Sequence, residues 1–372
     1  MAATAALVVI CLLLIGRAST GEVQVYHLGS WPPPYGIVLV LDRLSAMMVM
    51  LSATVGLFSL IYAIRGADTA GRSFHALFQF QLAGLNGAFL TGDLFNLFVF
   101  FEILLLGSYG LLLHGSSRVV YRSRECDSLY GGPDRTRAAL HYVVLNLVGS
   151  SLFLIGVAVI YAATGTLNMA DLARRMSEAV MVRPQLIEAG ALLLLVVFAL
   201  KAALVPLHFW LPSAYANASA PVAALFSLMT KVGVYAIIRI YTLVFGDGAG
   251  PLSHLAAPWL VVLALITVAV GAIGVVASVT LRRLVANLIL VSVGILLVGV
   301  SLFNATGLSG ALYYLIHTTL ITAGLFLLVD VIAAQRRKTR DRIIPGPAIS
   351  QALPLAALFF IAAVAIAGLP PF

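Results

Sequence analysis

The stretch ALLLLVVFALKAALVPLHFWLP, from Ala191 to Pro212, decides the fold class. It belongs to an apolar segment, 187–211, that is long enough to cross a bilayer as a helix. Proline cannot donate the helical hydrogen bond, so Pro206 and Pro212 predict a helix break at membrane depth. Freed backbone groups at that depth are tolerated only beside protein or water, which indicates an internal path rather than a lipid-facing kink.

The rest of the chain repeats this apolar pattern and predicts an all-α polytopic membrane protein with about eleven spans. No alternation of period two, as in a membrane barrel, is present. We expect one transmembrane domain over 1–372, with a cytoplasmic loop at 114–139 and a basic cytoplasmic loop at 334–349. The other ten apolar segments are 2–15, 44–63, 74–91, 94–113, 140–163, 219–245, 257–279, 284–303, 307–333 and 350–369.

Composition supports a lipid environment and excludes a soluble domain. The 372 residues are 62% hydrophobic and 10% charged, which is more apolar surface than a water-soluble fold can hide. The net charge of +8 does not indicate nucleic acid, because most of the basic residues lie in short loops between apolar segments.

The basic residues also predict the orientation in the membrane. The even-numbered loops carry fourteen Arg and Lys residues, whereas the odd-numbered loops carry only Arg17, Arg174, Arg175 and Arg183. Positive residues are retained in the cytoplasm, so we expect the even loops and the N-terminus there, in a bacterial inner membrane. The first segment, 2–15, is also near signal-peptide length, and that alternative stays open.

The end of the sequence suggests a second broken helix. The last segment finishes at Pro370 and Pro371 inside an apolar run, without a polar tail. One proline-broken segment in each half of a chain is typical of inverted repeats around an ion path at the midplane. A plain span end is the alternative interpretation, and the sequence looks truncated at both ends.

Three ionisable residues lie near the middle of apolar runs and are the main candidates for function. Glu102, Lys201 and Lys231 would each cost at least ~2.5–3.5 kcal/mol facing lipid, so we expect a partner or water beside them. Two of the three lysines are intramembrane, whereas the nineteen arginines serve mainly the loops. Lysine can lose its proton in an apolar site and arginine cannot, which favours a titratable path. A static Glu–Lys pair that only joins two helices is the alternative.

Two histidines could extend this path. His317 lies within an apolar segment and could relay protons, although a hydrogen bond to a backbone carbonyl would explain it equally well. His208 lies at the predicted helix break and is a candidate for proton access. Three other charged residues have structural interpretations. Asp42 would pair with Arg43 at a span entrance, and Arg239 would extend toward the membrane surface.

Nothing in the sequence predicts a cofactor or a metal. Cys11 and Cys126 form no ligand cluster, and no phosphate-binding or dinucleotide-binding motif occurs.

Three motifs resemble a known group, the antiporter-like membrane subunits. The motifs are GDLFNLFVFFE at 92–102, PLHFWLP at 206–212 and TKVGVYAIIR at 230–239. They resemble the D-type subunits of the Mrp-type monovalent cation/proton antiporters, in a superfamily shared with the proton-pumping subunits of respiratory complex I. Complex I relatives usually have Asp-Ala-His where Ser213-Ala-Tyr215 stands here.

The resemblance implies a mechanism and partners. Glu102 would pair with Lys201, with Lys231 and His317 as the next relays, in an antiporter-like bundle with inverted repeats. The partners would be other subunits of the complex, protons and a monovalent cation such as Na⁺. Two alternatives stay open: a proton-pumping, non-redox subunit of an NADH–quinone oxidoreductase or membrane hydrogenase, and a purely structural membrane scaffold.

Overall fold

The computed structural model describes residues 1–64, 66–115, 132–336, 339–347 and 349–368. Within these ranges the chain is almost entirely helical, with one small hairpin of β1 (Gln24–His27) and β2 (Val38–Leu41), paired antiparallel with Gln24 opposite Leu41. The helices are α1 (Ala2–Ala18), α2 (Arg43–Ala63), α3 (Phe74–Leu90), α4 (Leu94–Leu113), α6 (Gly132–Thr164), α7 (Met169–Val182), α8 (Pro184–Ala202), α9 (Trp210–Asn217), α10 (Ala220–Phe226), α11 (Met229–Leu243), α12 (Ala257–Val276), α13 (Leu281–Ser301), α14 (Ala305–Gln335) and α15 (Ala352–Ile366).

Eight helical stretches among the described residues are long and apolar enough to cross a membrane, and α10 with α11 counts as one of them. The shorter helices α1 and α15 are apolar as well. Helix α3, with 17 residues, is slightly shorter than any of the eight long stretches. The chain is a multi-pass membrane protein, as the segments predicted. Some boundaries differ. Helix α6 begins at Gly132, so residues 132–139 of the predicted loop 114–139 are helical, and α14 extends to Gln335, into the predicted loop 334–349.

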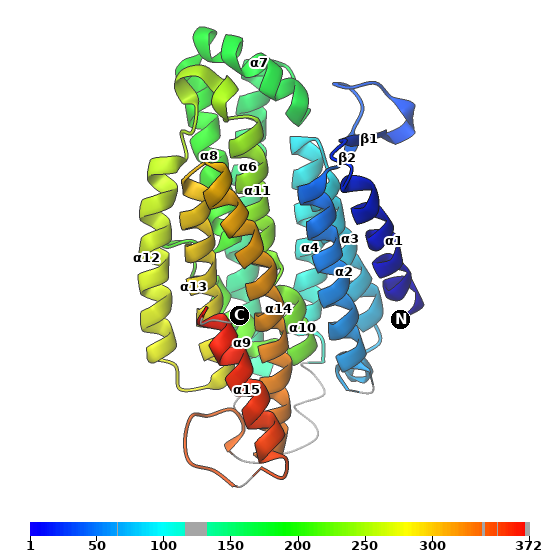
Figure 1. Ribbon diagram of the computed structural model, residues 1–372, viewed down its shortest axis with the longest axis vertical. Coiled ribbons are helices and arrows are strands. Elements are labelled where there is room, and N and C mark those ends of the chain that lie inside the picture. The colour runs from blue at the N-terminus through cyan, green and yellow to red at the C-terminus, as the bar shows by residue number, and fades with distance from the viewer. Residues whose placement is uncertain (65, 116–131, 337–338, 348, 369–372) are drawn as a thin grey trace.

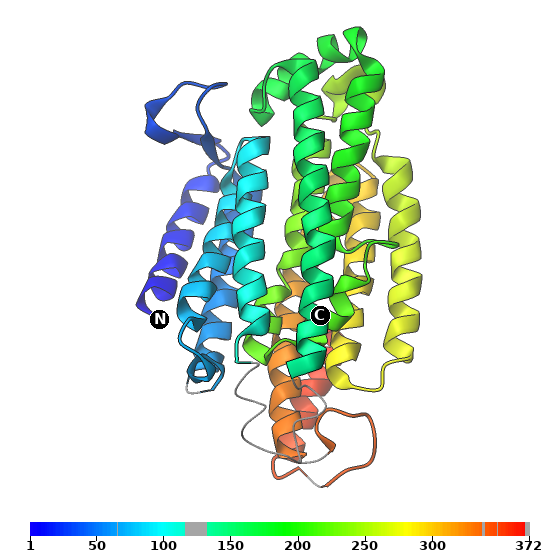
Figure 2. The ribbon, with the colours of Figure 1, turned by 180° about the vertical axis from the view of Figure 1, so that it is seen from behind.

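The long helices lie side by side along one direction (Figures 1 and 2). The hairpin and α7 lie at the upper end of Figure 1, and the connections after α2, α12 and α14 lie at the lower end. We call the lower end the basic end, because Arg72, Arg137, Arg283, Arg336 and Arg342 lie in or beside its connections. The other end is called the opposite end. The described parts of the even loops therefore share one end, as the charge pattern predicted.

Polar N-caps fix where several spans begin. Asp42 caps α2 by accepting a hydrogen bond from the Ser45 N–H, and Asp93 caps α4 through the Asn96 N–H. Thr280 and Asn304 cap α13 and α14 in the same way. Such side chains satisfy amide groups that the first helical turn leaves free, so they set the register of each span.

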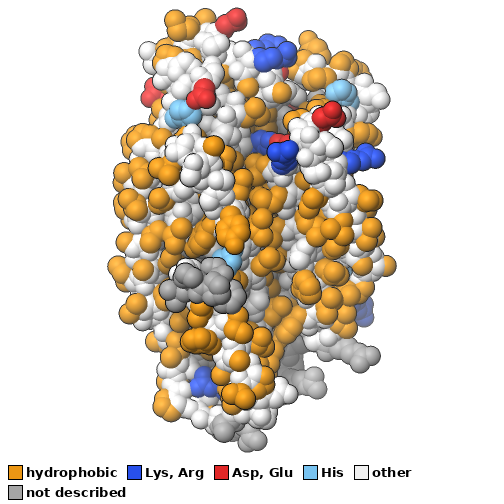
Figure 3. Space-filling model, in the orientation of Figure 1, with side chains coloured by type: hydrophobic (Ala, Val, Ile, Leu, Met, Phe, Trp, Pro, Cys, Tyr) orange, Lys and Arg blue, Asp and Glu red, His pale blue; other side chains and the backbone are white. Residues whose placement is uncertain are grey.

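The outer surface matches the lipid environment. Figure 3 shows hydrophobic side chains over the flank of the bundle, with charged groups gathered mainly toward its ends. Exposed large apolar residues occur on many spans, for example Leu147 on α6 and Ile273 on α12. In water this surface would drive aggregation, whereas in a bilayer it faces lipid tails.

The chain breaks between α8 and α9, where the prolines predicted a break. The α8 helix ends at Ala202, and Ala203 adopts a left-handed conformation with φ +61°. The indole N–H of Trp210 donates to the Leu200 carbonyl at 3.1 Å, and the Val205 N–H donates to the Thr267 hydroxyl at 3.0 Å. Protein groups thus satisfy the freed backbone at membrane depth.

A second interruption separates α10 from α11 at Ser227 and Leu228, and the sequence reasoning did not foresee it. No proline or glycine marks it. The Tyr215 hydroxyl donates to the Phe226 carbonyl at the end of α10, and the Ser227 hydroxyl donates to the Ala224 carbonyl. These bonds satisfy two backbone acceptors at the interruption, directly before the helix that carries Lys231.

Candidate functional site

Lys201 lies in the last turn of α8, just before the break, and its side chain is 7% exposed. Its Nζ lies 3.2 Å from the Asn146 Oδ1 of α6 and 5.7 Å from the centre of the Phe101 ring. A cavity of about 10 Å³ beside it is lined by Phe101, Asn146, Trp210 and Met229, among others. This volume is near the smallest that holds one water molecule.

Lys231 lies in the first turn of α11, just after the second interruption, and is completely buried. Its Nζ lies 3.1 Å from the Ser292 hydroxyl oxygen of α13. The neighbouring Thr230 hydroxyl is buried and has no hydrogen-bond partner among the described residues. Each membrane lysine therefore lies directly beside a backbone interruption.

Both lysines contact neutral oxygen acceptors whose orientation is fixed by a hydrogen bond that the acceptor's side chain donates to a backbone carbonyl. The Asn146 amide nitrogen donates to the Tyr142 carbonyl at 2.9 Å, so its oxygen faces Lys201. The Ser292 hydroxyl donates to the Ile289 carbonyl at 2.8 Å, so its lone pairs face Lys231. In both contacts the lysine must be the donor, as an ammonium or a neutral amine can be.

Helices α8 and α11 approach closely where the end of α8 meets Gly233. A Cβ added at Gly233 would lie 2.4 Å from the Ala202 nitrogen and 2.8 Å from the Lys201 carbonyl carbon. Only glycine permits this approach of one backbone to the other. Gly233, two residues after Lys231, thus lets α11 pack directly against the end of α8 that carries Lys201.

Glu102 lies on α4, half-buried, and accepts a hydrogen bond from the Ser150 hydroxyl of α6. Its charge acts on Lys201, but the two described side chains form no direct ion pair. The predicted pair is therefore indirect in this structure. Ser150 and Asn146 are one turn apart on α6 and link the two charges.

His317 lies on α14 and is part-buried. Its Nε2 lies 2.9 Å from the Ala365 carbonyl oxygen near the end of α15. This contact matches the structural alternative considered above, a histidine bonded to a backbone carbonyl. Its role as a relay stays a prediction.

His208 lies in the break and lines a cavity of about 510 Å³ with His141, Ser213, Arg283 and Asn287. Its Nδ1 is buried without a hydrogen-bond partner in the part of the chain that the structure describes. The cavity reaches Arg283 at the basic end, which fits access from that end.

The four predicted helix-breaking prolines have different positions. Pro206 lies within the break, whereas Pro212 lies in the first turn of α9, where a missing N–H costs no hydrogen bond. Pro370 and Pro371 lie outside the described residues.

Three polar residues of the site were missed from the sequence. They are Asn146, Ser150 and Ser292, and each contacts one of the predicted charges. A signal for two of them exists, because Tyr142, Asn146 and Ser150 recur every four residues in an otherwise apolar run. No group of three or more His, Cys, Asp or Glu side chains that could hold a metal occurs within the described ranges.

Comparison with known proteins identifies the family. Residues 91–372 match the family model described as "NADH:quinone oxidoreductase/Mrp antiporter, TM". The chain belongs to this family. It is 49% identical over 333 residues to the D subunit of a probable K(+)/H(+) antiporter of Rhizobium meliloti, covering 89% of this chain and 59% of that protein. It is 40% identical over 373 residues to the D subunit of a Na(+)/H(+) antiporter of Bacillus subtilis, covering 100% and 71%.

A solved structure of the Mrp complex from Dietzia has the same fold, with a TM-score of 0.82 and 33% identity over 100% of this chain and 66% of that one. These matches confirm the antiporter-like bundle that the motifs predicted. The chain spans about three fifths of the Rhizobium relative's length.

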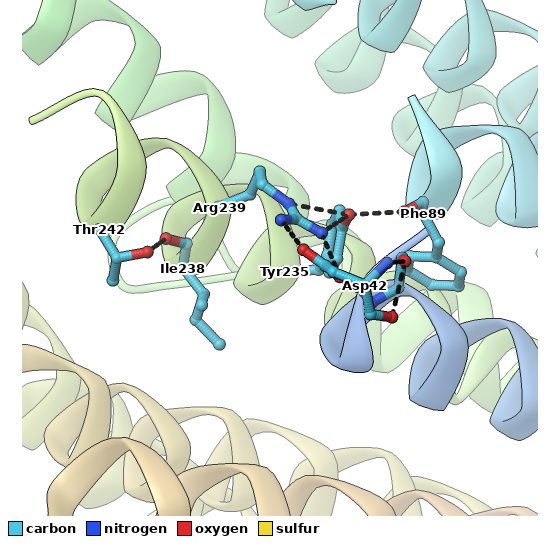
Figure 4. Close-up of polar contacts among 7 residues, drawn as sticks. Asp42, Phe89, Tyr235, Ile238, Arg239 and Thr242 are labelled. Carbon is cyan, nitrogen blue, oxygen red and sulfur yellow. Dashed lines mark hydrogen bonds and ion pairs between the residues drawn. The ribbon is translucent and has the colours of Figure 1, made fainter. Parts of the chain in front are cut away.

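In this antiporter-family chain a polar network at the opposite end ties α11 to α2 and α3 (Figure 4). The Arg239 guanidinium forms an ion pair with Asp42 and donates to the Tyr235 hydroxyl, which donates to the Phe89 carbonyl at 2.6 Å. The expected partner of Asp42, Arg43, instead donates to the Ser19 carbonyl. That pairing was wrong because adjacent residues at a helix start point in different directions.

A second ion pair lies at the basic end. Arg282 of α13 pairs with Asp330 of α14, which also accepts a hydrogen bond from the Tyr62 hydroxyl of α2 at 2.9 Å. Arg135 of α6 donates to the Asn217 and His114 carbonyls, so it joins the end of α9 to the end of α4. Ion pairs between helices thus occur at both ends of this antiporter-family bundle, and Lys201 and Lys231 lie between the two ends.

Proposed function

We propose that this chain is the proton-translocating membrane subunit of a multisubunit monovalent cation/proton antiporter of a bacterial inner membrane. It is a transporter subunit rather than an enzyme, and its N-terminus and basic end face the cytoplasm. The partners are the other subunits of the complex, protons, a cation such as Na⁺ or K⁺, and lipid. The names of the relatives support this assignment.

One observation carries the proposal: two lysines and a glutamate share the interior of a membrane-spanning bundle. Lys201 is 7% exposed and Lys231 is fully buried, and both lie beside interrupted helices. Ionisable groups at such depth are costly, so they are retained where ions or protons pass. A static pair is disfavoured, because Glu102 and Lys201 do not touch.

In the proposed mechanism a proton enters from the basic end through the cavity beside His208 and reaches Lys201. When the charge of Glu102 moves away, Lys201 passes its proton through ordered water toward Lys231 and then His317. Cation movement elsewhere in the complex drives this transfer or is driven by it.

The test uses everted vesicles from antiporter-deficient cells that carry the whole operon with an intact copy of this subunit. A pH gradient is formed, Na⁺ or K⁺ is added, and a pH-sensitive dye follows its collapse. We expect collapse in the wild type and in Arg183→Ala, an exposed control at the opposite end, and almost none in Lys231→Ala. Co-purification of the complex checks assembly, and normal exchange in an assembled Lys231→Ala variant would refute the proposal.

The second candidate is a proton-pumping subunit of a redox complex, since the matched family joins both kinds of protein. It predicts no response to cations, with NADH-driven acidification of the vesicles that depends on Lys231.

A further inference from the structure

Helix α6 presents a line of three buried polar side chains to the proton path. Tyr142, Asn146 and Ser150 are at most 5% exposed and are spaced by four residues, so they share one face. Beyond Ser150 the buried face of α6 continues with apolar residues such as Phe153, Val157 and Ile160. The polar part of this face therefore coincides with the level of Glu102 and Lys201.

The Asn146 amide has a defined orientation. A backbone carbonyl can only accept, so the amide nitrogen must face the Tyr142 carbonyl, and the amide oxygen must face Lys201. Lys201 therefore rests against a dipole rather than a charge. One turn further along, Ser150 gives Glu102 a hydroxyl donor, as an ionised carboxylate requires.

These two contacts occupy the positions that a direct ion pair would use. Glu102 bonds to Ser150 and Lys201 bonds to Asn146, so each of the two charges has its hydrogen-bond partner on α6. A direct pair at low dielectric would hold Lys201 charged. An amide oxygen is a weaker partner, and with it the ammonium and the neutral amine are closer in free energy.

We propose that Asn146 and Ser150 are positioning residues that hold Lys201 and Glu102 apart, so that Lys201 can both bind and release a proton. This inference rests on the function proposed above and adds that α6, which carries none of the charged relays, sets the pH range of transport. Glu102 of α4 is the charged group that acts on Lys201. The residues that α9 and α11 place around the same cavity, Trp210, Met229 and Val232, do not ionise near neutral pH.

The decisive experiment compares substitutions of Asn146 in the vesicle assay over a series of pH values. Asn146→Asp places a carboxylate beside Lys201 and favours the ammonium, so half-maximal exchange should move toward alkaline pH by about one unit or more. Asn146→Leu removes the acceptor, so half-maximal exchange should move toward acidic pH. Asn146→Ser keeps a neutral acceptor and should restore a profile close to the wild type.

Ser150 is tested against its neighbour on the same helix. Ser151 is exposed and bonds to the Leu147 carbonyl, so Ser151→Ala is a matched control that should transport normally. Ser150→Ala should slow exchange severalfold, and Ser150→Thr should retain it. In a Glu102→Gln background, Ser150→Ala should add no further loss.

The outcomes separate this inference from the proposed function. If the wild type shows no cation-dependent exchange, the proposed function fails. If the wild type exchanges and Lys231→Ala does not, while both Asn146→Asp and Asn146→Leu keep the wild-type pH profile or shift it in the same direction, the role of α6 is refuted. Should Asn146→Leu fail to assemble, the contrast between Asn146→Ser and Asn146→Asp decides.

Discussion

Asp42 makes two contributions to stability at the opposite end of the bundle, and two different substitutions of this residue separate them. Asp42 caps α2 through the Ser45 N–H, and it is the counter-charge of Arg239. Asp42→Ala removes both contributions. Asp42→Asn keeps a capping oxygen, because asparagine is a good N-cap, and removes only the charge.

The magnitudes follow from burial. Loss of the cap costs about 1 kcal/mol. Leaving one partner of a buried ion pair without the other costs about 3–5 kcal/mol, but the side chains of Arg239 and Asp42 are 13% and 21% exposed, so water screens part of this. With the Tyr235 hydroxyl still bonded to Arg239, we expect about 2–3 kcal/mol for Asp42→Asn and about 3–4 kcal/mol for Asp42→Ala. Adding Arg239→Leu to Asp42→Ala removes the orphaned charge and should leave only about 1 kcal/mol of loss.

The assay is thermal unfolding of the purified complex in nanodiscs, followed by tryptophan fluorescence at several pH values. Burial alone would raise the pKa of Asp42, but the hydrogen bond and charge of Arg239, together with Ser45, hold that pKa below its usual value. The stabilisation by the carboxylate is therefore complete above the ordinary value of about 4 and is lost as the pH falls through the lower folded value. The difference between wild type and Asp42→Asn should be constant from pH 8 to 5 and shrink in stronger acid.

The double variant gives the result that would refute this reasoning. If Asp42→Ala with Arg239→Leu melts no higher than Asp42→Ala alone, the cost does not come from an unpaired Arg239. A wild-type advantage over Asp42→Asn that persists unchanged at pH 3 would likewise contradict the role of the carboxylate charge.

Two further predictions concern the membrane interior. Gly233→Ala should destabilise the complex by about 1–3 kcal/mol and reduce exchange, because the added Cβ would lie 2.4 Å from the Ala202 nitrogen; unfolding and transport assays check both, and the exposed Ser151→Ala serves as control. Tyr142→Phe should cost about 1 kcal/mol, because its hydroxyl lies 2.9 Å from the Ser108 hydroxyl in a buried site; an unchanged melting temperature would show that this bond contributes nothing.

The sequence predicted the spans, the end of the bundle that carries the basic loops and the buried charges because each depends on strong local signals. Long apolar runs, the placement of arginine and the isolation of Lys201 and Lys231 need no tertiary information. The break at Pro206 was also predictable, since proline cannot be a helical donor. The interruption at Ser227 was not, because no proline or glycine marks it and the Tyr215 hydroxyl that satisfies the Phe226 carbonyl belongs to another helix, α9.

Pairings were harder to predict than positions. Asp42 contacts Arg239, which is 197 residues away, and not its neighbour Arg43. Ser292 contacts Lys231 across 61 residues, and nothing local distinguishes it from other serines in apolar segments. Among the missed residues, only Asn146 and Ser150 could have been found from the sequence, because their spacing of four places them on one face of one helix.

Both lysines contact an uncharged oxygen, whereas the direct Glu102–Lys201 pair expected from the sequence would place a carboxylate beside Lys201. A lysine against a carboxylate gains most when charged, so a permanent pair would resist proton release. Asn146 and Ser292 offer oxygen acceptors without charge, and each side chain is oriented by a hydrogen bond that it donates to the Tyr142 or the Ile289 carbonyl. Neither side chain can turn to donate to a neutral amine without breaking a backbone bond. Each lysine thus keeps its position in both protonation states, which suits a site that must load and unload a proton repeatedly.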